Sequence, residues 1–240
     1  MLLGMLCMAQ AKDRIVERPP FLAQNSSSIE IDKIVMSDTV TTVYIKAFYR
    51  PKYWIKIATG SVLKDNNGIL YPIRKGIGIT LDKEFWMPES GEAEFQLTFP
   101  PIPQNVTRLD FSEGDFEGAY KIWGIQLDKK SFGKFKLPKD VIVPKADHKM
   151  TLPDPIVKYD KAILKGRILD YQKGMPDKGS LYYQDVIREG AQEGKIRIQD
   201  DGTFYHEMNV FMITPCTIMF PFGTIEYLLA PGETTSIVIN

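Results

Sequence analysis

Four carboxylates lie close together in the first half of the chain. Asp110, Glu113, Asp115 and Glu117 stand in one short stretch that also contains two glycines. Calcium prefers oxygen ligands supplied by a loop, and a pair of carboxylates can hydrolyse a glycosidic bond. The spacing departs from the Asp-x-Asp-x-Asp-Gly calcium loop, so it favours a solvated acidic turn. Calcium binding by these four residues and hydrolysis by two of them remain the alternatives.

Aromatic side chains are the second candidate group. An aromatic ring has a large apolar face, and Tyr and Trp add a polar tip, which suits stacking against a sugar. The alternative is that these rings fill a core. The residues considered for a ligand surface are Trp54, Trp86, Trp123, Tyr182 and Tyr183.

The other residue types offer little chemistry. The two histidines, His148 and His206, are too few for a transition-metal site, and His206 and Glu207 are neighbours that would face opposite sides of a strand. Neither a Gly-x-Ser-x-Gly elbow nor a phosphate-binding glycine loop is present. Cys216 lies in an apolar run, which predicts a buried side chain. We therefore expect no catalytic residue, no metal and no cofactor.

The composition and the N-terminal residues indicate which classes of partner and which cellular compartment to expect for the protein. The 240 residues include 30 Lys plus Arg and 30 Asp plus Glu, so no net field attracts nucleic acid. Residues 2–8 are apolar and are followed by Ala9-Gln10-Ala11, the pattern of a signal peptide cleaved after Ala11. The apolar run is too short to span a membrane. The sequence therefore predicts export to the periplasm or cell envelope.

Period-two alternation of apolar and polar residues predicts strands nearly throughout. It is clear at residues 77–81 and 94–99, which flank a turn at 87–91. Asn67-Gly68 and Asp201-Gly202 predict hairpin turns, with Asn-Gly supplying two positive-φ positions. About eight short strands precede a proline- and lysine-rich stretch, and seven follow it, which is typical of antiparallel sandwiches.

The predicted fold is therefore all-β, with two antiparallel β-sandwich domains of the immunoglobulin-like or prealbumin-like kind in tandem. The expected organisation is a signal peptide at 1–11, a polar lead-in segment at 12–28, a first sandwich at 29–133, a linker at 134–160 and a second sandwich at 161–240.

Three segments of the second block carry a family resemblance. They read Lys-Gly-Arg-Ile at 165–168, Asp-Gly-Thr-Phe at 201–204 and Leu-Leu-Ala-Pro-Gly-Glu-Thr at 228–234. The block resembles the prealbumin-like or carboxypeptidase-regulatory-like sandwich of exported bacterial thioredoxin-like proteins of the TlpA type. Residues 53–55, 85–91 and 123–125 resemble an extra sandwich that precedes it in some of these proteins. That family's catalytic domain carries Cys-x-x-Cys, which this sequence lacks, so no catalytic residue is carried over.

Two functions follow from these patterns. The first is a non-catalytic exported binding or scaffold module, the accessory region of a thiol–disulfide oxidoreductase-like protein, with a protein partner or an appended domain. The second is a carbohydrate-binding or cell-surface adhesion module that uses exposed Trp or Tyr.

Overall fold

A computed structural model describes residues 13–128, 157–172, 174–184 and 190–239, with single positions at 137, 139, 151, 154 and 187. The predicted signal peptide, most of the predicted linker and His148 lie outside these residues. The chain divides into two compact units, Met1–Phe132 and Gly133–Asn240. Every regular element in the described part is a strand, so the predicted all-β class is confirmed. That part holds no helix long and apolar enough to cross a membrane.

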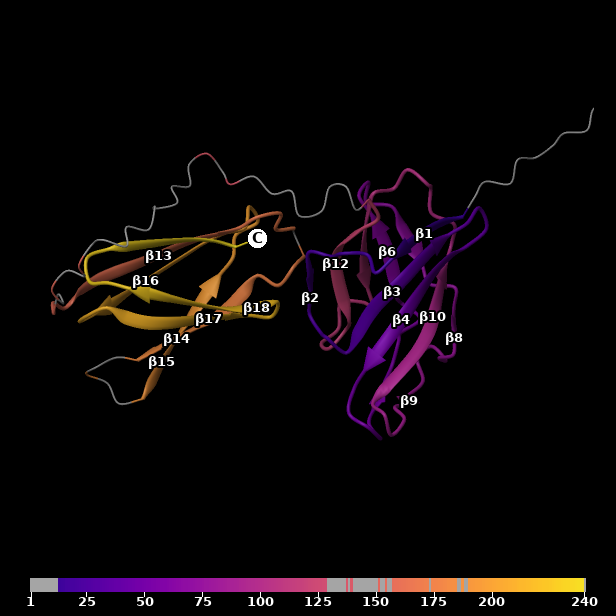
Figure 1. The fold of residues 1–240 in the computed structure, drawn as a ribbon, viewed down its shortest axis with the longest axis horizontal. Coiled ribbons are helices and arrows are strands. Elements are labelled where there is room, and N and C mark those ends of the chain that lie inside the picture. The colour runs from indigo at the N-terminus through magenta and orange to yellow at the C-terminus, as the bar shows by residue number, and fades with distance from the viewer. Residues whose placement is uncertain are drawn as a thin grey trace, which may run out of the picture. The chain divides into compact units, whose positions relative to one another are not determined.

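The first unit is built from two five-stranded antiparallel sheets (Figure 1). The first sheet has the order β1 (Arg14–Glu17), β3 (Ile29–Met36), β4 (Thr41–Phe48), β10 (Glu92–Phe99) and β8 (Lys75–Ile77). The second has the order β2 (Ala23–Gln24), β12 (Lys121–Gln126), β11 (Arg108–Ser112), β6 (Val62–Asp65) and β7 (Leu70–Pro72). A separate two-stranded ribbon joins β5 (Trp54–Ile55) and β9 (Phe85–Trp86).

One core lies between these two sheets. On β4, Val43 and Ile45 are buried while Tyr44 between them is partly exposed, because alternate residues face opposite sides of a sheet. Leu109 and Phe111 belong to the other sheet and to the same core cluster. The first unit is therefore a β-sandwich.

The segment 12–28 is not merely a polar lead-in, because it supplies two strands of this sandwich. β1 pairs with β3, and β2 pairs with β12. The Arg14 guanidinium donates hydrogen bonds of 2.7 Å to the carbonyl oxygens of Gln104, Val106 and Leu127. These bonds hold β1 against loops of the first unit.

The strand predicted over residues 77–81 is wrong beyond Ile77. Gly78 has φ 83° and Asp82 has φ 58°, so the backbone leaves the sheet after β8. Asp82 then accepts hydrogen bonds from the Thr59 amide (3.1 Å) and hydroxyl (2.6 Å). The chain re-forms a strand only at β9, which pairs with β5.

Both predicted glycine hairpins form, with a different backbone geometry. Of the pair Asn67-Gly68 only Gly68 has positive φ, and of Asp201-Gly202 only Gly202 does. The Gly68 amide donates to the Asp65 carbonyl at 3.0 Å, and the Asp65 amide donates to the Ile69 carbonyl at 3.0 Å. This pattern is the three-residue hairpin, a type I turn followed by a left-handed residue.

The second unit has a three-stranded and a four-stranded sheet. The first has the order β16 (Thr203–Val210), β13 (Asp160–Ile168) and β19 (Thr234–Ile239). The second has the order β15 (Ala191–Arg197), β14 (Lys178–Gln184), β17 (Thr214–Phe220) and β18 (Gly223–Leu229). Side chains of both sheets form one core cluster, which includes Leu164, Phe204, Leu181 and Ile218. The seven strands are antiparallel neighbours except β13 and β19, which pair in parallel.

Candidate functional site

Two of the predicted aromatic residues lie side by side on an exposed face of the first unit. In the β5–β9 ribbon, Trp54 stands directly opposite Trp86. Their neighbours Ile55 and Phe85 turn inward and belong to the core or pack against it. The outward residues are 44% exposed for Trp54 and 60% for Trp86. Directly opposed strand residues have Cβ atoms about 5 Å apart, so Trp54 and Trp86 form one surface, which we call the Trp pair.

Backbone hydrogen bonds fix the segments that carry the Trp pair. The Met87 amide donates to the Tyr53 carbonyl at 2.8 Å, and the Lys52 amide donates to the Met87 carbonyl at 3.2 Å. A third bond joins the Tyr49 amide to the Gly91 carbonyl at 2.9 Å. Figure 1 shows β9 at one end of the first unit, beside the ends of β4 and β10. Backbone hydrogen bonds therefore hold the ribbon that carries the Trp pair in place.

A turn next to the Trp pair holds an unusual backbone angle. Pro51 and Lys52 occupy the two central positions of a turn closed by a 3.1 Å bond from the Tyr53 amide to the Arg50 carbonyl. Lys52 has φ 63°, a left-handed conformation that is costly for a residue with a Cβ. The turn brings Tyr49 and Tyr53 together, with ring centres 6.3 Å apart and planes at 87°.

Polar groups border these rings. The Arg50 guanidinium lies 5.8 Å from the centre of the Tyr53 ring. The Lys52 ammonium pairs with the Glu89 carboxylate at 3.0 Å. Tyr49 and Tyr53 are exposed and were not among the predicted residues; their place beside Pro51, in the turn before a Trp-bearing strand, is the signal that could have found them.

The structure does not bring the other three predicted aromatics to this surface. Trp123 lies on β12 and is 7% exposed, so it is buried and offers no surface to a ligand. Tyr182 and Tyr183 belong to β14 in the second unit and point to opposite faces of its sheet. Tyr183 packs against the core, and Tyr182 lines a hollow on the outer face.

The four predicted carboxylates do not converge. Asp110 accepts a 2.7 Å hydrogen bond from the Gly124 amide. Glu113 is buried, and its two oxygens accept bonds from the amides of Ala58 (2.8 Å) and Tyr120 (3.0 Å). Burial raises the pKa of Glu113, although these two bonds oppose the rise.

The remaining two acids face solvent. Asp115 pairs with the Lys121 ammonium at 2.8 Å, and Glu117 is exposed. Among the described residues no group of three or more His, Cys, Asp or Glu is placed to hold a metal ion. The calcium site considered as an alternative at Asp110, Glu113, Asp115 and Glu117 is therefore not assembled.

Burial shifts the pKa of both Cys216 and His206 in the second unit. Cys216 is buried, and loss of hydration raises its thiol pKa to about 11. His206 is partly buried on β16, and burial lowers its pKa. Glu207, on the opposite face, pairs with the Lys161 ammonium at 2.8 Å.

Comparison with known proteins adds no family. No protein-family model and no curated protein matches the chain. Among solved structures it matches pullulanase from Anoxybacillus sp. LM18-11 complexed with maltotriose, at 10% identity and TM-score 0.26, over 79% of this chain and 24% of that one. Pullulanase type I from Bacillus subtilis complexed with maltose gives 7% identity and TM-score 0.28, over 79% and 23%.

The Bacillus anthracis TIE protein also matches, at 9% identity and TM-score 0.23, over 95% of this chain and 40% of that one. This chain thus spans about a quarter of the length of the pullulanases. At these TM-scores the matches carry no argument about what this chain binds.

Proposed function

We propose that this chain is a non-catalytic binding module that holds carbohydrate on Trp54 and Trp86. The observation that carries the proposal is that the two indoles stand directly opposite each other and are both exposed. An exposed pair of large rings leaves apolar surface in water unless a ligand covers it. The inner face of the same ribbon already supplies the core contacts through Ile55 and Phe85.

Carbohydrate is the ligand class that this surface suits. A sugar ring presents C–H groups on its face, which pack against an indole, and hydroxyl groups at its rim, which require hydrogen bonds. The tip of the ribbon offers both kinds of contact: the Trp pair for the faces, and Arg50, Lys52 and Glu89 for hydroxyls. The hydrogen bonds across the ribbon order these groups before a ligand arrives, which lowers the entropy cost of binding.

The proposal assigns no reaction to the chain. Asp110 and Glu113, two of the carboxylates considered for hydrolysis, accept backbone hydrogen bonds and so hold loops in place. Asp115 is engaged by Lys121. A glycosidase needs two carboxylates facing one bond, and these side chains face separate partners.

Screening on a glycan array followed by isothermal titration calorimetry tests this function. We expect Trp54→Ala and Trp86→Ala each to weaken binding about tenfold, which corresponds to the loss of about 1.4 kcal/mol of stacking. Both side chains are exposed, so each variant should stay folded. The matched control is Tyr205→Ala, which removes an exposed aromatic from β16 in the second unit and should leave the affinity unchanged.

Two results would reject the proposal. One is an array on which the folded wild-type chain binds no glycan. The other is a glycan that binds the double variant Trp54→Ala/Trp86→Ala as tightly as the wild type.

The accessory-region function is the second proposal. What favours it is the place of the segments on which the resemblance rests: Gly166 lies in β13, Gly202 closes the β15–β16 hairpin, and Gly232 lies in the turn before β19. Export belongs to this proposal, with N-terminal sequencing of the mature protein expected to begin at Lys12. Coding sequence beyond Asn240 that specifies a Cys-x-x-Cys domain would support it, and coding sequence for an unrelated domain would reject it.

A further inference from the structure

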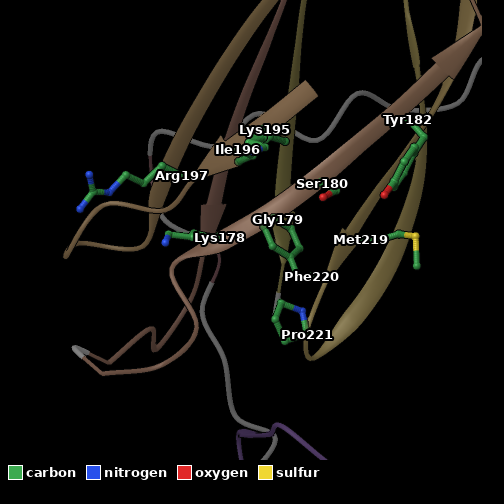
Figure 2. Close-up of a pocket in the computed structure, with 10 residues that line it drawn as sticks. All are labelled: Lys178, Gly179, Ser180, Tyr182, Lys195, Ile196, Arg197, Met219, Phe220 and Pro221. Carbon is green, nitrogen blue, oxygen red and sulfur yellow. The ribbon is translucent and has the colours of Figure 1, made fainter. Parts of the chain in front are cut away.

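A hollow of about 600 Å³ lies on the outer face of the four-stranded sheet in the second unit. Figure 2 shows Lys178 and Arg197 on one side of it and Tyr182 and Met219 on the other. This volume lies within the range of small-molecule sites, roughly 300–1,000 Å³. Every residue that lines the hollow belongs to the second unit, so it is separate from the Trp pair.

Strand register gathers positive charge at one side of the hollow. Lys178 on β14 stands directly opposite Arg197 on β15, and Ser180 stands opposite Lys195. Like charges that face each other across a sheet destabilise it. The neighbouring acids compensate only in part: Asp177 lies 3.6 Å from Arg197, and Glu193 bonds to the Ser180 hydroxyl at 3.2 Å. No described residue forms an ion pair with Lys178 or Lys195, and none of the lining residues is acidic.

The other side of the hollow is apolar. Met219, opposite Ser180 on β17, is 50% exposed. The next residue, Phe220, is buried and turns to the core face of the sheet, where its ring lies over Gly179 of β14. A Cβ on Gly179 would stand only 2.6 Å from that ring, so the glycine creates the space for the phenyl group. The Phe220 ring stacks on Phe222, with centres 5.1 Å apart and planes at 6°.

We propose that this hollow binds a small organic anion: a flat apolar body carrying one carboxylate. The body lies over Met219 beside the Tyr182 ring, and the carboxylate faces Lys178 and Lys195. This arrangement removes apolar surface from water and places a negative charge beside Lys178, one of the two opposed cations. The proposal concerns a second site and does not depend on carbohydrate binding by the Trp pair.

Titration of the full chain with naphthoate, and with its neutral counterpart naphthylmethanol, tests the site. We expect naphthoate to bind at least about fivefold more tightly than the alcohol, because two exposed cations each contribute a modest attraction. Added salt should weaken naphthoate binding and leave the alcohol unaffected, since salt screens exposed charges.

Amino-acid substitutions test which residues are responsible for binding naphthoate. The double variant Lys178→Gln/Lys195→Gln should weaken naphthoate binding about tenfold, and Met219→Thr should weaken both ligands about threefold. The matched control Lys165→Gln removes an exposed lysine from β13 in the other sheet and should change neither affinity. Trp54→Ala should likewise have no effect, which separates this site from the Trp pair.

Equal affinity for the acid and the alcohol would overturn the proposal. So would a lysine double variant that binds naphthoate like the wild type, or a Lys165→Gln control that loses as much affinity as the double variant.

Discussion

Glu113 shows how a side chain with catalytic potential is used to build a loop. It is 3% exposed, and each of its oxygens accepts one backbone amide hydrogen bond, from Ala58 and from Tyr120. These bonds join the turn between β11 and β12 to the segment after β5. A buried carboxylate that satisfies two backbone amides is costly to replace, which explains its position without a reaction.

The pH dependence of stability should reveal this role. Burial raises the pKa of Glu113 in the folded state, so the folded chain holds this proton more tightly than the unfolded chain. Its protonation therefore favours folding below the raised pKa, and the contribution is lost as pH rises through that value. We expect Glu113→Gln to cost about 1–3 kcal/mol, because one amide loses its acceptor, and the cost should grow as pH falls from 7 toward the ordinary Glu value of about 4.3.

Urea unfolding of wild type and variant at a series of pH values measures this difference. Glu117→Gln is the matched control, since Glu117 is exposed in the same turn. A Glu113→Gln cost that shrinks on acidification would contradict a raised pKa in the folded state.

Single residues also mark the limit of the sequence analysis. Trp54, Trp86 and Trp123 all lie in short strands, yet only two reach the surface. Around Trp123 the alternation is interrupted: Gly124 has φ 66°, and the pairing of β11 with β12 shifts register between Leu109 and Phe111. As a result Ile122 and Ile125 both join the core cluster, while Trp123 is buried outside that cluster. Alternation along a sequence assigns residues to the correct face of a sheet only where no bulge shifts the pairing of the strands.

At the scale of elements, glycine in the Lys-Gly-Arg segment is required by packing. A Cβ on Gly166 of β13 would collide with the ring of Phe204, the buried residue opposite it on β16. Both residues belong to the segments that carry the family resemblance, 165–168 and 201–204. The pairing of β13 with β16 places them opposite each other. Their contact is a property of the folded sheet that neither segment shows alone.

Replacing this glycine should destabilise the second unit. We expect Gly166→Ala to cost about 1–3 kcal/mol, because Phe204 must leave its rotamer or the strands must separate. Gly223→Ala is the control: it lies in β18, and a Cβ there would meet nothing within 4 Å. Scanning calorimetry should show a lower unfolding temperature for Gly166→Ala only; an unchanged temperature would show that the site accommodates a methyl group.

Elements were predictable where alternation was bounded by strong turns. β10 (Glu92–Phe99) lies within two residues of the strand predicted at 94–99, and both hairpin glycines have positive φ. The strand predicted over residues 77–81 was wrong because Gly78 takes a left-handed conformation. The alternation of polar and apolar residues carries no information about that backbone angle. β1 and β2 were missed because their partners, β3 and β12, are distant in sequence.

For the molecule as a whole, the all-β class followed from alternation and turn spacing, because these are local signals. The order of strands is not local. β19 pairs with β13 in parallel, although every turn signal in the second half is compatible with antiparallel neighbours. Likewise, the residue types at 53–55 and 85–91 do not predict that these two segments pair. The Trp pair forms only because they do.

Two-dimensional NMR of the three indole N–H groups tests the central claim most directly, because the chain contains three tryptophans and one of them is an internal control. During titration with a glycan identified on the array, we expect the signals of Trp54 and Trp86 to shift together along one binding curve, while that of buried Trp123 stays in place. Shifts confined to Trp123, or a bound glycan that moves none of the three signals, would contradict binding at the Trp pair.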